Sequence, residues 1–475
     1  MDSTGFRAEK DSMGPMQVPD WALWGASTQR AVENFPIAGR GVPAEVIHAF
    51  GLLKAACAEA NRELGKLPPD KARAIIDASE EIARGELDRH FPVDVYQTGS
   101  GTSTNMNANE VIANRASQKA GKPIGSRDPV HPNDHVNMGQ SSNDTFPTAM
   151  HVAAAVAIHG SLKPALSKLH GALAKHAKDW DDAIKIGRTH LMDATPIRVG
   201  QVFSGYAAQV ENGIARADRA IQALCELAIG GTAVGTGINT HVDFARRVCQ
   251  DLSRRTGLPF REAANHFEAQ AAKDAFVEAS GCLKTIAVSL SKVGNDIRWL
   301  GSGPRCGIFE LILPATQPGS SIMPGKINPV ICESVIQVAC RVLANDSAVA
   351  WAAFGGVGSL FELNVAMPIM ADAMMESIHL LSRVSHVFVD KLLAGLQLNR
   401  RRCEELIEKS LMMVTSLASV IGYDEAAKIA KEAFEEGLTI RELVVRKKLI
   451  DLGKLDELLD AWSMTEPGAA GPGGG

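Results

Sequence analysis

Apolar residues recur at steps of three and four over long stretches of the chain, which is the spacing of a helix buried along one face. The longest regular stretch lies between residues 276 and 300 and predicts a helix roughly 36 Å long, at about 1.5 Å per residue. Its apolar positions are Phe276, Ala279, Leu283, Ile286, Leu290, Val293, Ile297 and Leu300. Residues 203–224 repeat this spacing, and residues 162–173 repeat it more briefly, with Pro164 as an expected bend. These apolar positions indicate packing between helices and do not point to catalytic or binding residues.

Five long helices are expected between about residues 143 and 395, two of them near residues 330–354 and 367–395. Long helices that follow one another in this way form a bundle. Strand signals are few and short, for example Glu310–Leu313. The sequence therefore predicts a mainly all-α fold with a central bundle of long helices.

The 475 residues are too many for one compact core and suggest about two to four domains. We expect a mixed, mostly helical N-terminal domain over residues 1–138 and the long-helix bundle over residues 139–397. A small helical C-terminal domain is expected over residues 398–475, with Thr439 and Glu442 as a capping box. Its Gly/Pro-rich tail, Pro467–Gly475, is expected to be disordered.

Composition and charge argue against several classes of partner. The net charge of −5 is small and basic residues do not cluster, so no nucleic-acid partner is expected. No run of about 18 apolar residues occurs, so we expect no contact with a membrane. The eight cysteines are scattered without a CxxC pair, which favours free thiols in a reducing compartment. The first ten residues are polar and charged, so we expect no signal peptide and a cytoplasmic location.

Neither a metal nor a cofactor is expected. Histidines and acidic residues do not fall at the spacings of zinc or EF-hand sites, and no dinucleotide-binding GxGxxG follows a strand. A mildly acidic protein that binds an anion must then build a local positive site from a few lysines, arginines and helix N-termini.

Polar segments that interrupt the helices are the candidate sites. Thr98–Asn107 combines glycines with hydroxyl and amide side chains that can approach a ligand, although an ordinary capped helix start explains it slightly better. Gln140–Asp144 precedes a long helix, where free N–H groups favour a carboxylate, but Ser and Asn are also common N-caps. His131 could bind a ligand, yet a lone histidine in a turn is more often structural. Lys185–His190 contains the best general acid–base candidate by residue type, because imidazole titrates near neutral pH.

The segment Gly319–Asn328 reads Gly-Ser-Ser-Ile-Met-Pro-Gly-Lys-Ile-Asn and is the most specific of these signals. It can place a hydroxyl, several backbone N–H groups, an ammonium and an amide around one small anion. This equipment suits removal of a proton from carbon next to a carboxylate and stabilisation of the charge that develops. A plain flexible linker explains this mixture of residues less well.

Together these segments resemble the fumarase/aspartase superfamily, whose signature is GSSxMPxKxN, and within it they are most similar to the class II fumarate hydratases. The resemblance covers nearly the whole chain, from Asp11–Gly14 to Ile421–Asp424. It includes Gly187–His190 and Gly230–Gly237 as well as the signature itself.

The resemblance implies the L-aspartase/fumarase-like fold and a homotetramer with a core of twenty helices, five from each subunit. It implies active sites assembled from three subunits and the reversible addition of water to fumarate, a small dicarboxylate, to give L-malate. It also implies that the reaction needs no metal.

The resemblance also implies roles for individual residues. Ser320 would remove the proton from malate, while Lys326 and Asn328 would hold the carboxylates and stabilise an aci-carboxylate intermediate. His190, paired with Glu333, would handle the water on the opposite face. The other dicarboxylate-binding residues would be Ser100, Gly101, Thr102, Ser141, Ser142, Asn143, Thr189 and Ser321. A second, peripheral anion site would be formed by His131, Pro132, Asn133 and Asp134.

Two alternatives stay open at this point. The first is aspartate ammonia-lyase, which expels ammonia: Ser142 and Gly325 argue against it, whereas Asn133–Val136 resembles its motif as much as that of fumarases. Met192 and Val365–Pro368 also depart from the common fumarase pattern. The second is a non-catalytic protein that reuses the scaffold, which should have lost at least one of the residues implied in chemistry; all are present.

Overall fold

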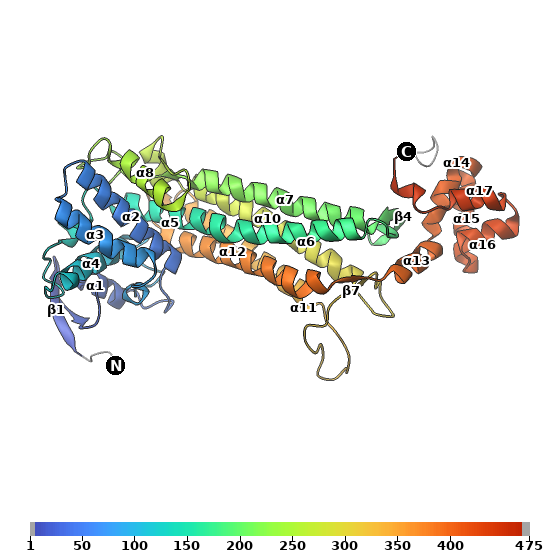
Figure 1. Ribbon diagram of the computed structural model, residues 1–475, viewed down its shortest axis with the longest axis horizontal. Helices are drawn as coiled ribbons and strands as arrows, with labels where there is room; N and C mark the ends of the chain where they lie inside the picture. Colours follow the sequence, from blue (N-terminus) through green and yellow to red (C-terminus); the bar gives the residue numbers. More distant parts are fainter. Residues whose placement is uncertain (1–4, 468–475) are drawn as a thin grey trace. The chain divides into compact units, whose positions relative to one another are not determined.

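The structure is a computed structural model that describes residues 5–467, so the tail beyond Pro467 that we expect to be disordered lies outside the described residues. Long helices occupy the middle of the chain where the apolar stripes predict them (Figure 1). They are α5 (Ser142–Ala157), α6 (Lys163–Asp179), α7 (Val199–Leu224), α10 (Asp274–Leu300), α11 (Val330–Ala353) and α12 (Met367–Val387). A π-helical turn, Ile158–Leu162, joins α5 to α6 without a break just before Pro164, where a bend is expected, so the six segments form the five long helices that the sequence predicts.

The described chain forms two compact units. The first contains the described residues up to Pro164 together with Gly213–Ala287 and Val338–Ser382, and the second contains Ala165–Asn212, Val288–Gln337 and the described residues from Arg383 onward. The boundaries fall inside long helices, so α7, α10, α11 and α12 each contribute to both units. The expected three-domain division remains a prediction.

In the first unit, α2 (Ala44–Glu63) packs against α3 (Pro69–Ala83), α5 and α8 (Phe244–Thr256) around a core that includes Phe50, Phe146 and Phe244. An antiparallel hairpin, β1 (Phe6–Asp11) and β2 (Gly14–Pro19), contacts α1 (Ala26–Asn34). The remaining α-helices and short strands of the first unit are α4 (Thr102–Lys119), α9 (His266–Ala271), β5 (Glu226–Leu227), β6 (Arg261–Glu262), β8 (Ser359–Leu360) and β9 (Leu363–Asn364).

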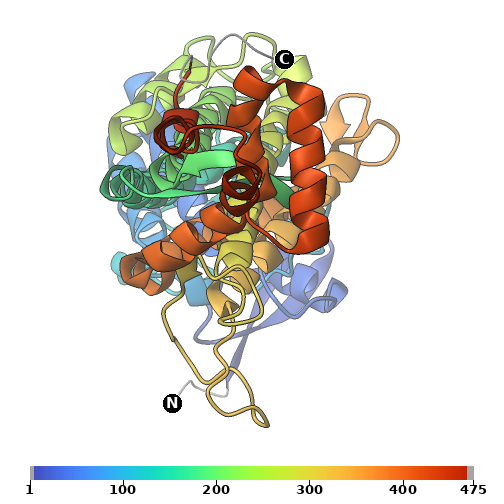
Figure 2. The same ribbon diagram turned by 90° about the vertical axis from the view of Figure 1, so that its right-hand side faces the viewer.

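The second unit contains the hairpin of β3 (Ile184–Thr189) and β4 (Met192–Arg198) and the short pair β7 (Leu311–Ile312) and β10 (Gln397–Leu398). Small C-terminal helices follow β10 (Figure 2). They enclose a core of their own that includes Leu417, Ile429 and Leu443. These helices are α13 (Arg400–Lys409), α14 (Ala418–Ile421), α15 (Tyr423–Glu436), α16 (Ile440–Lys447) and α17 (Leu452–Leu458). The predicted capping box of Thr439 and Glu442 begins α16.

No helix within residues 5–467 is both long enough and apolar enough to cross a membrane.

Candidate active site

Three hydroxyl groups meet in the first unit where two helices begin. The Ser100 and Thr102 hydroxyl oxygens lie 2.9 Å apart, and the Thr102 and Ser142 hydroxyl oxygens lie 2.7 Å apart. We call Ser100, Thr102 and Ser142 the hydroxyl cradle. Thr102 is the first residue of α4 and Ser142 the first residue of α5, so the positive ends of two helix dipoles meet at the cradle. Free N–H groups and dipoles of this kind favour a carboxylate.

The backbone around the cradle is fixed by close packing and by a cap. Ser141 caps α5, because its hydroxyl accepts from the Asn143 N–H and its own N–H donates to Asp144. Gly101 has a φ of 76°, and a Cβ there would lie 2.0 Å from the Phe146 ring. The Asn143 side-chain amide donates to the Ala233 carbonyl, which ties the cradle to the Gly-rich segment 230–237. The segment Gln140–Asp144 therefore caps α5 and at the same time contributes Ser142 to the hydroxyl cradle.

In the second unit, the loop that carries Ser320 folds back on itself. The Ser320 hydroxyl oxygen accepts from the N–H groups of Ile322 at 3.3 Å and Met323 at 3.0 Å. The Gly319 N–H donates to the Lys326 carbonyl, and the Asn328 side-chain amide donates to the Gly319 carbonyl at 2.6 Å. Hydrogen bonds to an oxygen stabilise its charged form, so this turn is suited to lower the free energy of a Ser320 alkoxide.

Lys326 and Asn328 line a cavity of about 540 Å³ beside the loop, and Lys326 and Ser320 line a second of about 450 Å³. Among the described residues, no hydrogen bond or ion pair engages the Lys326 ammonium or the Glu333 carboxylate. Glu333 lies in the first turn of α11. Both side chains are therefore available to a ligand or to another chain.

His190 lies at the tip of the β3–β4 hairpin, in the two-residue turn between Thr189 and Met192. The φ angles of His190 and Leu191 are 56° and 63°. Such left-handed turns usually contain Asn or Gly, and other residues there cost roughly 1–2 kcal/mol each. Strain of this kind is frequent at functional sites. The side chain of His190 is exposed in the single chain.

A buried ion cluster holds the base of this hairpin. The Glu310 carboxylate, 1% exposed, accepts two hydrogen bonds from Arg188, at 2.9 and 3.0 Å, and lies 3.2 Å from the Lys185 ammonium. Burial lowers the pKa of Lys185, with Glu310 acting in the opposite direction. Helix α13 also contacts β3, and the Asn399 N–H donates to the Glu310 carbonyl. The cluster therefore fixes the strand that ends in Thr189 and His190.

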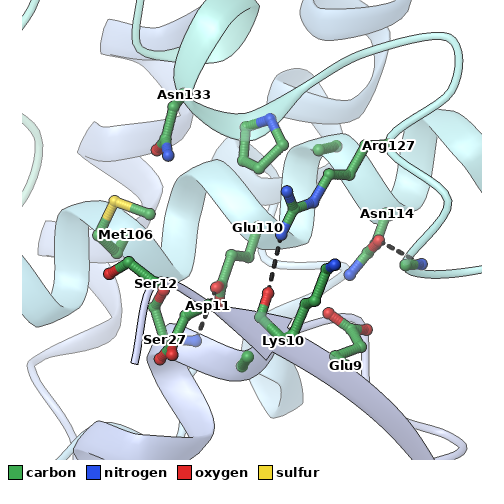
Figure 3. A pocket seen from close by; sticks show the side chains of 14 residues that line it. Glu9, Lys10, Asp11, Ser12, Ser27, Met106, Glu110, Asn114, Arg127 and Asn133 are labelled. Carbon is green, nitrogen blue, oxygen red and sulfur yellow. Dashed lines mark hydrogen bonds between the residues drawn. The ribbon is translucent and has the colours of Figure 1, made fainter. Parts of the chain in front are cut away.

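Two of the four residues predicted for a peripheral anion site, Pro132 and Asn133, line a cavity of about 400 Å³ in the first unit, whereas His131 and Asp134 do not line it (Figure 3). Pro132 and Asn133 line it from one side, and Lys10 of β1 lines it from the other. The His131 ring already has hydrogen-bond partners within the chain, because its Nδ1 accepts from the N–H groups of Asn133 and Asp134, both at 3.2 Å. His131 therefore caps the backbone of this turn, which is the structural role expected for a lone histidine in a turn.

Sequence reasoning did not include Arg127, whose guanidinium lines this cavity and donates to the Lys10 carbonyl (Figure 3). Arg127 has a φ of 58° and stands alone in a turn, so no spacing pattern indicates it. Lys54, described below, was also missed. Its signal was present, because a lysine interrupts the apolar run from Phe50 to Cys57.

The chain brings some predicted residues together and leaves others apart. Ser100, Thr102 and Ser142 form one hydrogen-bonded group in the first unit, with Gly101, Ser141 and Asn143 beside them. Ser320, Ser321, Lys326 and Asn328 share one loop in the second unit. Within the described residues, no hydrogen bond or ion pair joins His190 to Glu333, so their predicted pairing stays a prediction. The described part of the chain contains no group of three or more His, Cys, Asp or Glu arranged to hold a metal ion.

Comparisons with known proteins identify relatives over nearly the full length. A family model described as Lyase matches residues 14–344, and one described as Fumarase C C-terminus matches residues 413–466. A class II fumarate hydratase of Mycobacterium tuberculosis is 55% identical over 470 residues, which cover 98% of this chain and 97% of the relative. A mitochondrial fumarate hydratase of Danio rerio is 50% identical over 98% of this chain and 91% of its own length. The solved class II fumarase of Schistosoma mansoni superposes with a TM-score of 0.94 at 39% identity and covers 97% of this chain and 99% of its own.

Proposed function

The chain belongs to the class II fumarate hydratase family of lyases, and from this premise we propose that it adds water reversibly to fumarate to give L-malate at sites shared between copies of the chain. Ser320 is the base that takes the C3 proton of malate. On the opposite face His190, paired with Glu333, protonates the hydroxide that leaves malate and, in the reverse direction, takes a proton from the water that adds to fumarate. The observation that carries the assignment is the pair of N–H groups on the Ser320 oxygen.

The reaction needs this help because a proton next to an ionised carboxylate is very weakly acidic. Its removal adds a second negative charge to that carboxylate, which fixed donors must stabilise. Removing one donor of this kind typically costs about 2.7–4 kcal/mol of transition-state stabilisation. We assign this task to the Lys326 ammonium and the Asn328 amide.

The remaining residues hold the two carboxylates of the substrate. The hydroxyl cradle supplies uncharged donors at two helix starts, where free N–H groups and the helix dipoles stabilise a carboxylate. The other positioning contacts are proposed to come from Gly101, Ser141, Asn143, Thr189 and Ser321. We propose that the segment His131, Pro132, Asn133 and Asp134 binds a second anion, with Pro132, Asn133 and Arg127 lining the cavity beside it.

A homotetramer is proposed because long helices expose large apolar residues in the single chain. Val288 and Trp299 of α10 are 52% and 47% exposed, and Trp351 of α11 is 64% exposed. Exposed apolar groups of this size favour burial against another protein surface. We propose the cytoplasm as the location, since all eight cysteines are free.

Absorbance near 240 nm tests the function directly. L-malate should produce a rise as the conjugated product forms, and L-aspartate should produce none. Ser320→Ala should lose turnover by a factor of about 10³ or more while it assembles normally, because Ser320 is the hydroxyl of the loop that accepts from the Ile322 and Met323 N–H groups, whereas Ser321 and Lys326 are assigned to binding the substrate. Ser204→Ala, which removes an exposed hydroxyl of α7, is the control.

The same assay separates the alternatives. Equal or faster turnover of L-aspartate would assign the chain to ammonia elimination instead, and no turnover of either substrate would favour a non-catalytic scaffold. Full activity of Ser320→Ala would remove Ser320 from its role.

A further inference from the structure

Lys54 of α2 is a fully buried lysine that the mechanism above does not use. Its side chain is 0% exposed, yet its ammonium makes no hydrogen bond to a carboxylate. Instead it donates to three neutral amide oxygens, those of Asn105 at 2.8 Å, Gln140 at 2.8 Å and Asn137 at 3.2 Å. We call these three residues the amide layer. Burying an ammonium is unfavourable unless its donors are satisfied, and here all three are.

The amide layer lies directly beneath the hydroxyl cradle. Asn105 stands one helical turn after Thr102 on α4, so the two side chains lie on the same face. Gln140 immediately precedes Ser141 and Ser142. The Thr145 hydroxyl oxygen lies 2.8 Å from the Ser141 carbonyl oxygen and 3.1 Å from the same Asn105 oxygen, so it lies between the first turns of α4 and α5. Lys54 therefore joins the two helix starts from below.

One buried carboxylate lies close to this group. Asp144, 0% exposed, accepts from the N–H groups of Ser141, Gly230 and Thr232 at 2.9–3.0 Å. Burial raises the pKa of Asp144 to about 6 and lowers that of Lys54 to about 8. The three N–H donors on the Asp144 carboxylate and the three oxygens around the Lys54 ammonium favour the charged form of each group. Without Lys54, a buried negative charge would stand beneath a site proposed to hold a dianion.

We propose that Lys54 is a positioning and specificity-determining residue, whose buried positive charge offsets Asp144 and makes the hydroxyl cradle favour doubly charged over singly charged acids. The proposal rests on the function assigned above, in which the cradle holds a dicarboxylate. Uncharged hydroxyls orient a carboxylate, while the lysine beneath them sets the local potential without touching the ligand. A buried charge is screened weakly by salt, so its influence reaches beyond its hydrogen bonds.

The test compares binding of two non-reacting acids of nearly equal shape, succinate with two charges and succinamate with one. Calorimetry gives the ratio of the two dissociation constants for each protein. Lys54→Met should lower the preference for succinate about ten-fold, the scale of one partly screened charge–charge interaction within a protein. If Lys54 had a purely structural role, Lys54→Met would weaken the binding of both acids equally and leave the ratio of their dissociation constants unchanged.

A second variant covers the case in which Lys54→Met does not fold. Asn137→Asp keeps Lys54 and the side-chain shape and places a carboxylate on the ammonium, where the Asn105 and Asn109 amides also donate. It should lower the ratio as Lys54→Met does. Lys119→Met removes a lysine paired with Glu81 at the surface of the same unit and should leave the ratio at the wild-type value.

Each outcome decides a separate question. Unchanged ratios in folded Lys54→Met or Asn137→Asp would overturn the role of Lys54, as would a wild-type protein without preference for succinate. A wild-type protein that binds succinate with this preference but does not hydrate fumarate would overturn the proposed function and leave the role of Lys54 supported.

Discussion

At the scale of single residues, Gly319 shows how closely the Ser320 loop is folded. A Cβ at this position would lie 2.3 Å from the Lys326 carbonyl oxygen, so Gly319→Ala must displace the backbone that orients Ser320. We expect kcat to fall roughly a hundred-fold, since a misplacement of about 1 Å has this effect on a catalytic group. The unfolding temperature should hardly change, because the loop is mostly exposed. Gly355→Ala, whose added Cβ meets nothing within 4 Å, should leave kcat unaffected, and equal kcat values for both variants would contradict the expectation.

His151 provides a prediction about pH. Its Nδ1–H donates to the carbonyls of Leu224 and Glu226, its ring stacks on Phe276, and burial lowers its pKa from 6.5 to about 4. The unfolded chain therefore binds more protons than the folded chain between these values, and stability falls as the pH drops from about 6.5 to 4. The contribution of this group is at most about 1.4 kcal/mol per pH unit.

Urea unfolding at several pH values measures this dependence. His151→Gln keeps a donor for the two carbonyls but cannot titrate, so its stability should fall less steeply below pH 6.5 than that of the wild type. The absolute stability of the variant is not the readout, since the ring contact with Phe276 is also lost. Identical slopes for the two proteins would show that His151 does not contribute to acid destabilisation.

At the scale of elements, the β3–β4 hairpin depends on Glu310. Glu310→Ala would leave Arg188 and Lys185 buried without their counter-ion, which typically costs about 3–5 kcal/mol. The strand that presents His190 should loosen with it, so we expect both a lower unfolding temperature and a lower kcat. Glu310→Gln is the matched variant, because it keeps the shape and one acceptor; it should recover part of both losses. A stable and fully active Glu310→Ala would show that the hairpin is held by its strand pairing alone.

The regular spacing of apolar residues predicted the long helices well, because a helix buried along its length has apolar residues at every third or fourth position. It did not predict the antiparallel hairpins β1–β2, β3–β4 and β8–β9. The β3–β4 turn contains His190 and Leu191 in left-handed conformations, and neither residue type signals such a turn. The strand β7 lies within Glu310–Leu313, where the sequence shows a short strand signal, but its pairing with β10 is long-range and no local pattern indicates it. The mainly helical fold and the family are confirmed, whereas the hairpins required the structure.

For the site, the polar segments found from sequence do contain the hydroxyl cradle and the Ser320 turn. A loop that combines hydroxyl, glycine and amide residues can be recognised from the sequence alone. Lys54 and Glu310 are different, since each lies in an apolar stretch far along the chain from the residues it supports. Their significance depends on tertiary contacts, which spacing does not reveal.

At the scale of the whole molecule, the predicted sharing of active sites has a measurable consequence. The cradle, the Ser320 loop and the His190 hairpin are each well formed, but no contact among the described residues joins His190 to Glu333. If they meet across copies, the particle in solution should have about four times the chain mass of 50.5 kDa, as light scattering can determine. A stable monomer would contradict the shared site.

Mixing two inactive variants tests the sharing itself. Ser320→Ala and His190→Asn should each be nearly inactive as pure assemblies. If an active site takes Ser320 from one copy and His190 from another, random mixed tetramers contain sites with both residues intact, at roughly a quarter of the total. Unfolding and refolding the two variants together should therefore restore up to about a quarter of wild-type activity. Each variant refolded alone is the control, because it contains no site with both residues. If both residues came from the same copy, every site would lack one of them, and the mixture would stay as inactive as its parts.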